Sequence, residues 1–159
     1  MTFKTADLSD DNEGRVQVVE PGLRDFGGIR RFHGEIVTIR ADGDFSRVRE
    51  QVNLDGSGKV LVIDNDASLD CALLGDLLAA AANSNGWQGV VVNGCIRDSA
   101  DIGDMDIGVK ALATNPARGA RQGRGNVNVE LGFLGANFRP GEQLYSDEDG
   151  ILLSETALF

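Results

Sequence analysis

Hydrophobic and polar residues along this chain predict buried strands joined by short helices. Two apolar runs rich in β-branched residues, 60–63 and 89–92, are typical of strands covered on both faces. The segment 32–39 alternates with a period of two and predicts a further strand. Leu77, Leu78, Ala81 and Ala82 recur at helical spacing, and Asn85-Gly86 predicts the end of that helix. A second helix is predicted for 45–53.

The two ends of the chain add shorter elements. The sequence predicts a short helix or turn at 6–10, a connection or edge strand at 14–20, and a strand at 109–113. It also predicts an antiparallel pair, 126–131 with 134–138, and a last hairpin, 143–146 with 151–154. The glycine-rich stretch 115–125 carries three arginines and reads as a flexible basic loop, either solvated or used for a partner or substrate. Together these elements predict one α/β domain, residues 1–159, with a mixed sheet.

Candidate chemistry gathers on both sides of the second buried strand, 89–92. Gly75 and Asp76 open the predicted helix, and the backbone N–H groups of residues 75–78 would face an anion at its positive end. Twenty residues separate Asp76 from Arg97, which follows the strand at the edge where α/β sheets place their ligands. Arginine captures a carboxylate or a developing enolate oxygen with two hydrogen bonds. The pattern therefore fits the carboxylate and oxo group of a 2-oxo acid.

Acidic residues beside this arginine suggest a metal. Asp98, with Asp101 three residues later, offers hard oxygen ligands for Mg²⁺ or Mn²⁺, directly or through water. An Arg-Asp pair after a strand is also typical of a solvated ion pair or a helix cap, so spacing alone leaves both interpretations open.

Several motifs resemble one known family. They are Gly75-Asp-Leu-Leu, the run from Gly86 to Asp98, Val62-Ile-Asp, Asp106-Ile-Gly-Val-Lys-Ala and Tyr145-Ser-Asp-Glu-Asp-Gly-Ile-Leu-Leu. From about residue 5 to 153 the chain resembles the "regulator of ribonuclease E activity A" family. That family includes the class II aldolases of 4-hydroxy-4-methyl-2-oxoglutarate and 4-carboxy-4-hydroxy-2-oxoadipate.

The resemblance implies roles for individual residues. Asp76, Arg97, Asp98 and Asp101 match the Asp-x20-Arg-Asp signature of the family's enzymes and the acidic residue three positions later. Members that act only as ribonuclease regulators tend to lose the aspartate after the arginine, whereas this chain keeps it. Arg97 and Asp98 would then be catalytic, with the metal on Asp98 and, through water, on Asp101. Residues Gly75, Asp76, Leu77, Leu78 and Arg97 would bind the substrate.

The same resemblance implies an architecture and an activity. It predicts a three-layer β/β/α swivelling-domain fold, assembled as a homotrimer or a dimer of trimers with sites between subunits. The expected activity is metal-dependent retro-aldol cleavage of 4-hydroxy-4-methyl-2-oxoglutarate to pyruvate, with oxaloacetate decarboxylation beside it. The alternative is a non-catalytic regulator that binds a ribonuclease E-type enzyme.

The net charge of the chain limits the classes of partner that it is expected to bind. The net charge of −10 disfavours direct binding to nucleic acid or to an anionic membrane but suits a basic protein partner.

No apolar run is long enough to span a bilayer, and residues 1–12 do not resemble a signal peptide. Cys71 and Cys95, placed in a predicted helix and turn, are expected to be reduced thiols of a cytoplasmic protein. The chain lacks the glycine-rich motifs of dinucleotide, ATP and S-adenosylmethionine sites.

Overall fold

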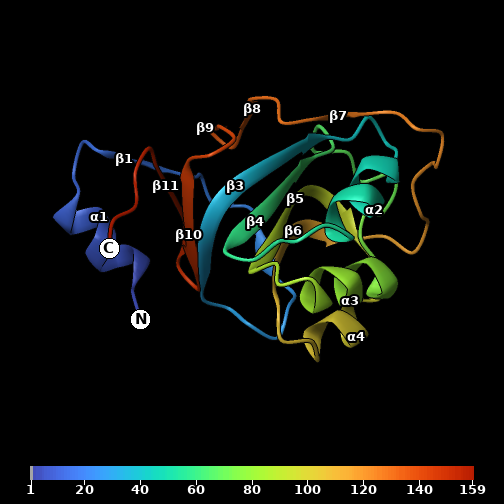
Figure 1. Cartoon of the computed structure of the whole chain (residues 1–159), viewed down its shortest axis with the longest axis horizontal. Helices are drawn as coiled ribbons and strands as arrows, with labels where there is room; N and C mark the ends of the chain where they lie inside the picture. The colour runs from blue at the N-terminus through green and yellow to red at the C-terminus, as the bar shows by residue number, and fades with distance from the viewer. Residues whose placement is uncertain (1) are drawn as a thin grey trace.

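Four parallel strands form the middle of the molecule, which a computed structural model describes for residues 2–159 (Figure 1). The helices are α1 (Thr5–Asp11), α2 (Ser46–Val52), α3 (Asp76–Ser84) and α4 (Ser99–Gly103). The strands are β1 (Val16–Val18), β2 (Arg24–Asp25), β3 (Phe32–Arg40), β4 (Lys59–Asp64), β5 (Gly89–Ile96), β6 (Gly108–Thr114), β7 (Asn126–Val127), β8 (Leu131–Phe133), β9 (Ala136–Phe138), β10 (Gln143–Asp147) and β11 (Gly150–Ser154).

The sheet is mixed, as the sequence predicted. Its strand order is β1-β11-β10-β3-β4-β5-β6-β2, and β7 pairs with β3. Strands β3, β4, β5 and β6 run parallel, whereas β1, β10 and β11 pair antiparallel at one side and β2 at the other. The hairpin β8–β9 is separate.

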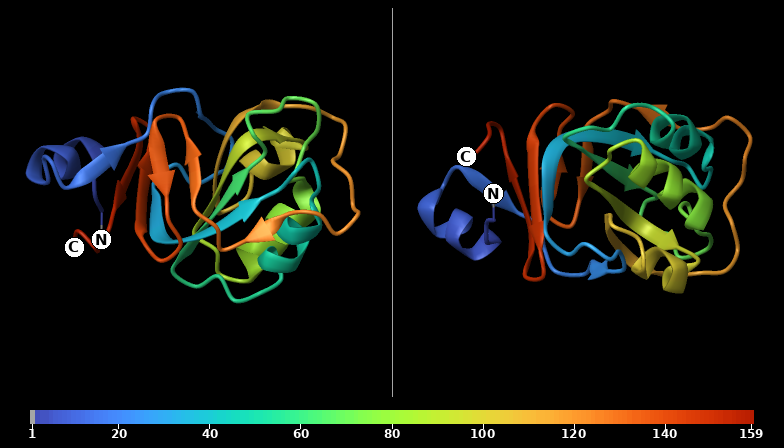
Figure 2. Two further views of the ribbon diagram at one scale, coloured as in Figure 1. Left: turned by 90° about the horizontal axis from the view of Figure 1, so that it is seen from above. Right: turned by 60° about the horizontal axis from the view of Figure 1, so that its bottom comes forward.

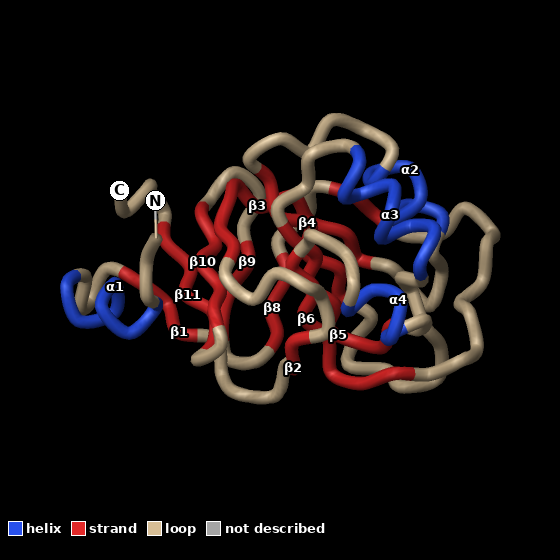
Figure 3. The backbone as a smooth tube through the Cα atoms, turned by 90° about the horizontal axis from the view of Figure 1, so that it is seen from below, coloured by secondary structure: helices blue, strands red, loops and turns tan. Residues whose placement is uncertain are grey.

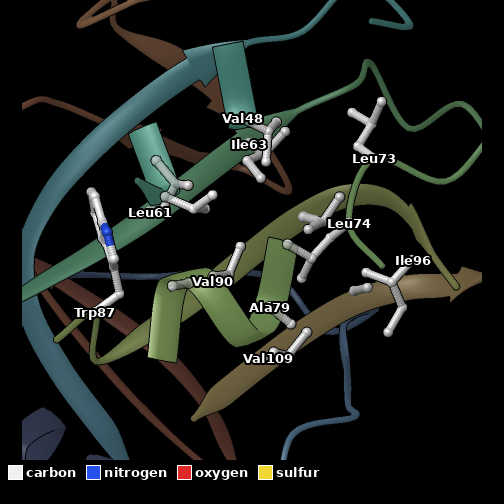
Figure 4. Close-up of a cluster of buried hydrophobic side chains, with 14 of the residues drawn as sticks. Val48, Leu61, Ile63, Leu73, Leu74, Ala79, Trp87, Val90, Ile96 and Val109 are labelled. Carbon is white, nitrogen blue, oxygen red and sulfur yellow. The ribbon is translucent and has the colours of Figure 1, made fainter. Parts of the chain in front are cut away.

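Side chains of the parallel strands alternate between two cores. Leu61, Ile63, Val90 and Val92 pack in the cluster that also contains buried residues of α2 and α3, and Figure 4 shows several of these side chains filling the space under the helices. Val60, Val62 and Val91 belong to a second cluster with residues of β8, β9, β10 and β11. The period of two along each strand produces this division. One face of the sheet thus carries helices and the other carries strands, which gives the expected β/β/α layers.

A ring of Phe32 explains why two glycines occur in neighbouring strands. Gly89 of β5 pairs with Gly108 of β6. A Cβ at Gly89 would lie 2.4 Å from the Phe32 ring, and one at Gly108 would lie 2.1 Å from it. Only glycine leaves room for the aromatic ring to lie flat across this pair.

The two ends of the described chain lie close together, far from the helices that cover the sheet. Figures 2 and 3 show both termini beside α1 and β11, at the opposite end of the molecule from α2, α3 and α4. His33 lies near this end, stacked on Tyr145 and edge-on to Phe3 and Phe159. Burial lowers the pKa of His33. These aromatic contacts give His33 a structural place in the cluster.

Four local predictions were wrong. Strand β5 does not turn at Asn93-Gly94 but continues to Ile96 through an irregularity in its pairing with β6. Leu77 does not lie on the buried face of α3, because its side chain is 81% exposed while Ala79 and Ala82 are buried. Segment 126–131 is not one strand, since β7 ends at 127 and pairs with β3. The antiparallel pair is β8 with β9 instead.

Smaller differences concern the cysteines and a helix that the sequence did not predict. Cys71 lies in the loop before α3 and Cys95 lies within β5, rather than in a helix and a turn; both are free thiols. The five-residue helix α4 follows Asp98 directly. Over residues 2–159, no helix has both the length and the apolar character needed to cross a membrane.

Candidate functional site

An isolated β-bridge and two backbone hydrogen bonds bring Asp76 and Arg97 together across twenty intervening residues. Ala72 bridges to Cys95 in the parallel sense, the Leu73 N–H donates to the Cys95 carbonyl, and the Arg97 N–H donates to the Leu74 carbonyl. The chain before α3 therefore runs beside the end of β5. Helix α3 begins where β5 ends, so its N-terminus faces the residues that follow the strand.

Gly75 allows this approach to be unusually close. A Cβ at Gly75 would lie 2.8 Å from Asp98 Oδ2 and 3.3 Å from Arg97 Nε. The φ angle of Gly75 is −123°, which any residue can adopt, so the requirement is space rather than backbone conformation. Both functional side chains thus lie directly against the residue that caps α3.

Asp98 turns its carboxylate back onto α3. Its φ of 57° lies in the left-handed region, which non-glycine residues enter at a cost of roughly 1–2 kcal/mol. Its Oδ2 accepts a hydrogen bond of 3.0 Å from the Asp76 N–H. This hydrogen bond lowers the pKa of the Asp98 carboxyl, and the charge of Arg97 lowers it further, against an opposing effect of burial. Asp98 is therefore an anion held at the positive end of a helix.

The sequence left open whether Asp98 caps a helix or binds a metal, and the position of its carboxylate is compatible with both roles. It caps a helix through Oδ2, while its Oδ1 has no hydrogen-bond partner within the described chain. Asp101 lies in the first turn of α4, exposed, three residues beyond it. Between residues 2 and 159, no three His, Cys, Asp or Glu side chains gather closely enough to hold a metal by themselves.

The amides of α3 are partly occupied by the protein. The Asp76 N–H donates to Asp98, and the Leu77 N–H donates to the Asp76 side chain at 2.8 Å. The N–H groups of Gly75 and Leu78 have no acceptor among the described residues. An anion at this helix end would therefore meet two free amides rather than four, and the substrate-binding role of residues 75–78 stays a prediction.

Arg97 is half-buried and forms no salt bridge in the described chain, although its charge acts on the neighbouring Asp98. Its Nη1 donates to the Pro116 carbonyl at 3.4 Å, a long hydrogen bond that leaves most of its donors free. The guanidinium thus lies between Gly75 and the loop 115–125. It remains available for a carboxylate or an oxo group.

These residues border a cavity of about 420 Å³ between α2, the first half of α3 and the loop 115–125. Gly75, Asp76, Leu77, Leu78 and Arg97 all line it, as the predicted substrate site requires. Asp98 and Asp101 do not line it, and Asp98 reaches the cavity through its contact with Asp76.

The sequence left the role of the loop 115–125 open between a solvated loop and a partner or substrate element, and the structure places this loop in the wall of the cavity. Arg118 and Arg121 line the cavity together with Arg97, and Arg49 of α2 joins them. The loop was predicted to be flexible, yet Ala72 accepts from the Gly119 N–H at 2.9 Å and donates to the Ala117 carbonyl at 2.7 Å. The three arginines at intervals of three residues were the available signal, but their partners come from distant segments.

Comparison with known proteins finds relatives that match this chain over nearly its whole length. A curated protein of Dechloromonas aromatica (strain RCB) is 54% identical over 99% of both chains, and one of Pseudomonas aeruginosa (strain LESB58) is 52% identical over 99% of this chain and 98% of its own. Both are named "Putative 4-hydroxy-4-methyl-2-oxoglutarate aldolase".

Two solved structures share the fold with a TM-score of 0.96. The RNA-processing inhibitor RraA from Thermus thermophilis is 40% identical, with 100% of this chain and 96% of that chain covered. A protein of Geobacillus kaustophilus HTA426, described as an S-adenosylmethionine: 2-dimethylmenaquinone methyltransferase, is 42% identical, with 98% and 97% covered. The family model described as "RraA-like: Aldolase/RraA" matches residues 5–153. The chain belongs to this Aldolase/RraA family.

Proposed function

We propose that this protein is a divalent-metal-dependent carbon–carbon lyase that cleaves 4-hydroxy-4-methyl-2-oxoglutarate to two molecules of pyruvate and also decarboxylates oxaloacetate. The observation that carries the proposal is the meeting of Arg97, Asp98 and the N-terminus of α3 at the edge of a cation-lined cavity. The names of the curated relatives support the aldolase activity.

The 2-oxo acid end of the substrate fits beside α3. The free N–H groups of Gly75 and Leu78 hold the 1-carboxylate, and the positive helix end adds to that attraction. Arg97 donates to the 2-oxo oxygen. As the bond between C3 and C4 breaks, negative charge moves onto that oxygen, and a guanidinium already in place stabilises it.

The carboxylates beside Arg97 fit a hard divalent cation. Mg²⁺ commonly keeps several waters and takes only one or two protein carboxylates, which matches the free Oδ1 of Asp98 and a water-mediated contact to Asp101. When bound there, Mg²⁺ or Mn²⁺ would polarise the 2-oxo group and help neutralise the charge that develops on it.

The two proposed reactions differ in whether they need a base to remove a proton. In the retro-aldol step the 4-hydroxyl loses its proton as C4 becomes a carbonyl carbon, and C3 later gains one to complete the methyl group of pyruvate. Asp76 is the one carboxylate among the residues that line the cavity. We assign it the removal of the 4-hydroxyl proton, directly or through a water. Oxaloacetate loses carbon dioxide instead, so that reaction needs no such base.

The test is pyruvate release from both substrates, with Mg²⁺ and with a chelator, for wild type and Asp98→Ala. Wild type should release pyruvate only with the metal, and Asp98→Ala should fall to the rate of Mg²⁺ alone. Wild-type turnover by Asp98→Ala would refute the assignment. A matched control is Asp104→Ala, which removes an exposed carboxylate at the far end of α4.

The proposed assembly is a homotrimer, or a dimer of trimers, with sites between subunits. The family resemblance is the basis of this proposal, and Leu77, an 81% exposed leucine on the border of the cavity, is the position at which a contact between copies can be tested. Sedimentation equilibrium of wild type and Leu77→Asp tests this assembly. A monomeric wild type would contradict it.

A second candidate function is inhibition of a ribonuclease E-type enzyme by protein–protein binding. The net charge of −10 and the likeness to the inhibitor from Thermus thermophilis favour it. Inhibition through the acidic surface should persist in Asp98→Ala, whereas lyase activity should not. A methyltransferase role is disfavoured, because S-adenosylmethionine carries a sulfonium cation and the cavity has four arginines.

A further inference from the structure

The charge inside the cavity is opposite to that of the chain. The protein has a net charge of −10, yet four of the residues that line this cavity are arginines and only one is acidic. Arg49, Arg97, Arg118 and Arg121 have no ion-pair partner in residues 2–159. Like charges that share one cavity repel each other, and an anion relieves that repulsion. The 2-oxo acid end of the substrate engages only Arg97, which leaves the exposed side chains of Arg49, Arg118 and Arg121 at the cavity without an assigned ligand.

The loop that carries two of these arginines is fixed in place. Backbone hydrogen bonds on both sides of Arg118 tie it to Ala72. Beyond Arg121, the Gln122 N–H donates to the buried carboxylate of Asp44 at 2.6 Å, and Arg124 lies 3.6 Å from the same oxygen.

The Asp44 carboxyl group stays ionised at neutral pH although it is buried. Burial alone would raise its pKa, but hydrogen bonds from Ser46, from Gln122 and from Arg124 outweigh burial and lower the pKa to about 2. Backbone hydrogen bonds between Ala120 and both Gly43 and Phe45 secure the same turn. The loop is therefore a built wall of the cavity, anchored by Ala72, by the buried Asp44 and by the turn from Gly43 to Phe45.

Two segments of the chain supply the cations. Arg97 lies against Gly75 at the start of α3, whereas Arg118 and Arg121 come from the loop. Arginine is suited to bidentate capture of carboxylates. A ligand with a carboxylate at each end would satisfy both positions, whereas a monocarboxylate would leave the loop arginines unpaired.

We propose that Arg118 and Arg121 form a second carboxylate subsite that selects dicarboxylic 2-oxo acids over monocarboxylic ones. The assignment rests on the proposed function for the orientation of the ligand, with its 2-oxo acid end at Arg97. Arg118 and Arg121 are specificity-determining residues, since they contact the distal carboxylate, which retro-aldol cleavage leaves unchanged.

The experiment compares two ligands of equal chain length that cannot undergo cleavage. Calorimetric titration in Mg²⁺ buffer measures the dissociation constants of 2-oxoglutarate and 2-oxopentanoate, which differ only in a terminal carboxylate against a methyl group. Wild type should bind 2-oxoglutarate at least about tenfold more tightly, as expected for charge-assisted hydrogen bonds. The double variant Arg118→Gln/Arg121→Gln should bind both ligands with the affinity that wild type shows for 2-oxopentanoate. Arg118→Lys/Arg121→Lys should recover part of the preference.

The matched control removes two cations elsewhere. Arg15 and Arg139 lie beside a different surface depression, so Arg15→Gln/Arg139→Gln changes the net charge equally and should keep the preference. Retained affinity for 2-oxopentanoate shows that the loop variants are folded.

The outcomes separate this proposal from the lyase assignment. A preference that survives the loop substitutions, a wild type that binds the two ligands equally, or a wild type that binds neither would overturn the subsite. If wild type prefers 2-oxoglutarate through the loop arginines yet releases no pyruvate from any substrate, the subsite stands and the lyase assignment falls.

Discussion

Replacing Gly75 with alanine tests the closest contact in the candidate site. The added Cβ would lie 2.8 Å from Asp98 Oδ2, whereas ordinary contact begins at 3.4 Å, so the carboxylate must move by about 0.6 Å. Arg97 Nε, at 3.3 Å, must give way slightly as well. A misplacement of about 1 Å in a catalytic group can cost a factor of about one hundred. We therefore expect kcat/KM for pyruvate release to fall between about tenfold and a hundredfold.

The stability of Gly75→Ala should change much less. The backbone of Gly75 suits alanine, and the main losses are a weaker cap and a strained Asp98 hydrogen bond, together about 1–2 kcal/mol. Urea unfolding measures this quantity, and a coupled lactate dehydrogenase assay measures pyruvate. Gly132→Ala is the matched control, because its Cβ would meet only Asn137 at an ordinary 3.5 Å. If Gly75→Ala keeps wild-type kcat/KM, the contact with Asp98 and Arg97 is not needed for turnover.

Three further substitutions have distinct expected results. Arg97→Ala should lose about 3–4 kcal/mol of transition-state stabilisation, seen in kcat with oxaloacetate, and an unchanged kcat would contradict its role. Asp76→Asn should slow retro-aldol cleavage far more than oxaloacetate decarboxylation; equal losses would remove it as the base. Asp44→Asn should lower the free energy of unfolding by about 1–3 kcal/mol at neutral pH. Because folding lowers the pKa of Asp44 from 3.8 to about 2, its stabilisation is present above pH 4 and disappears toward pH 2, so wild type and Asp44→Asn should converge there.

The sequence predicted the elements that local patterns determine. The β-branched runs became β4 and β5, the alternating segment became β3, and the alanine run became α3. The last hairpin formed as β10 and β11, joined by residues 148 and 149. In each case a single period or turn signal decided the structure.

Predictions failed where distant residues decide the structure. Leu77 matches the helical pattern of its neighbours, but the small residues Ala79 and Ala82 face the sheet, and no local signal ranks them above a leucine. Asn93-Gly94 looks like a turn, yet pairing with β6 continues beyond it.

The candidate site likewise contains residues that local sequence patterns indicate and residues whose position depends on distant segments. Spacing located Asp76, Arg97 and Asp98, because strand, helix and signature lie in one continuous segment. The contribution of Arg118 and Arg121 depends on Ala72 and on the buried carboxylate of Asp44, some 46 and 78 positions away from the loop residues that they hold. Glycines and arginines in that stretch indicate only a mobile polar loop until those partners are known.

In the proposed site, Arg97 and a metal on Asp98 stabilise negative charge on the oxygen of a 2-oxo acid. Exchange of the methyl protons of pyruvate in D₂O, followed by NMR, measures that stabilisation without knowledge of the natural substrate. Wild type with Mg²⁺ should exchange these protons far faster than Mg²⁺ alone, and Arg97→Ala and Asp98→Ala should each abolish the acceleration. Exchange by wild type at the rate of Mg²⁺ alone would contradict the account.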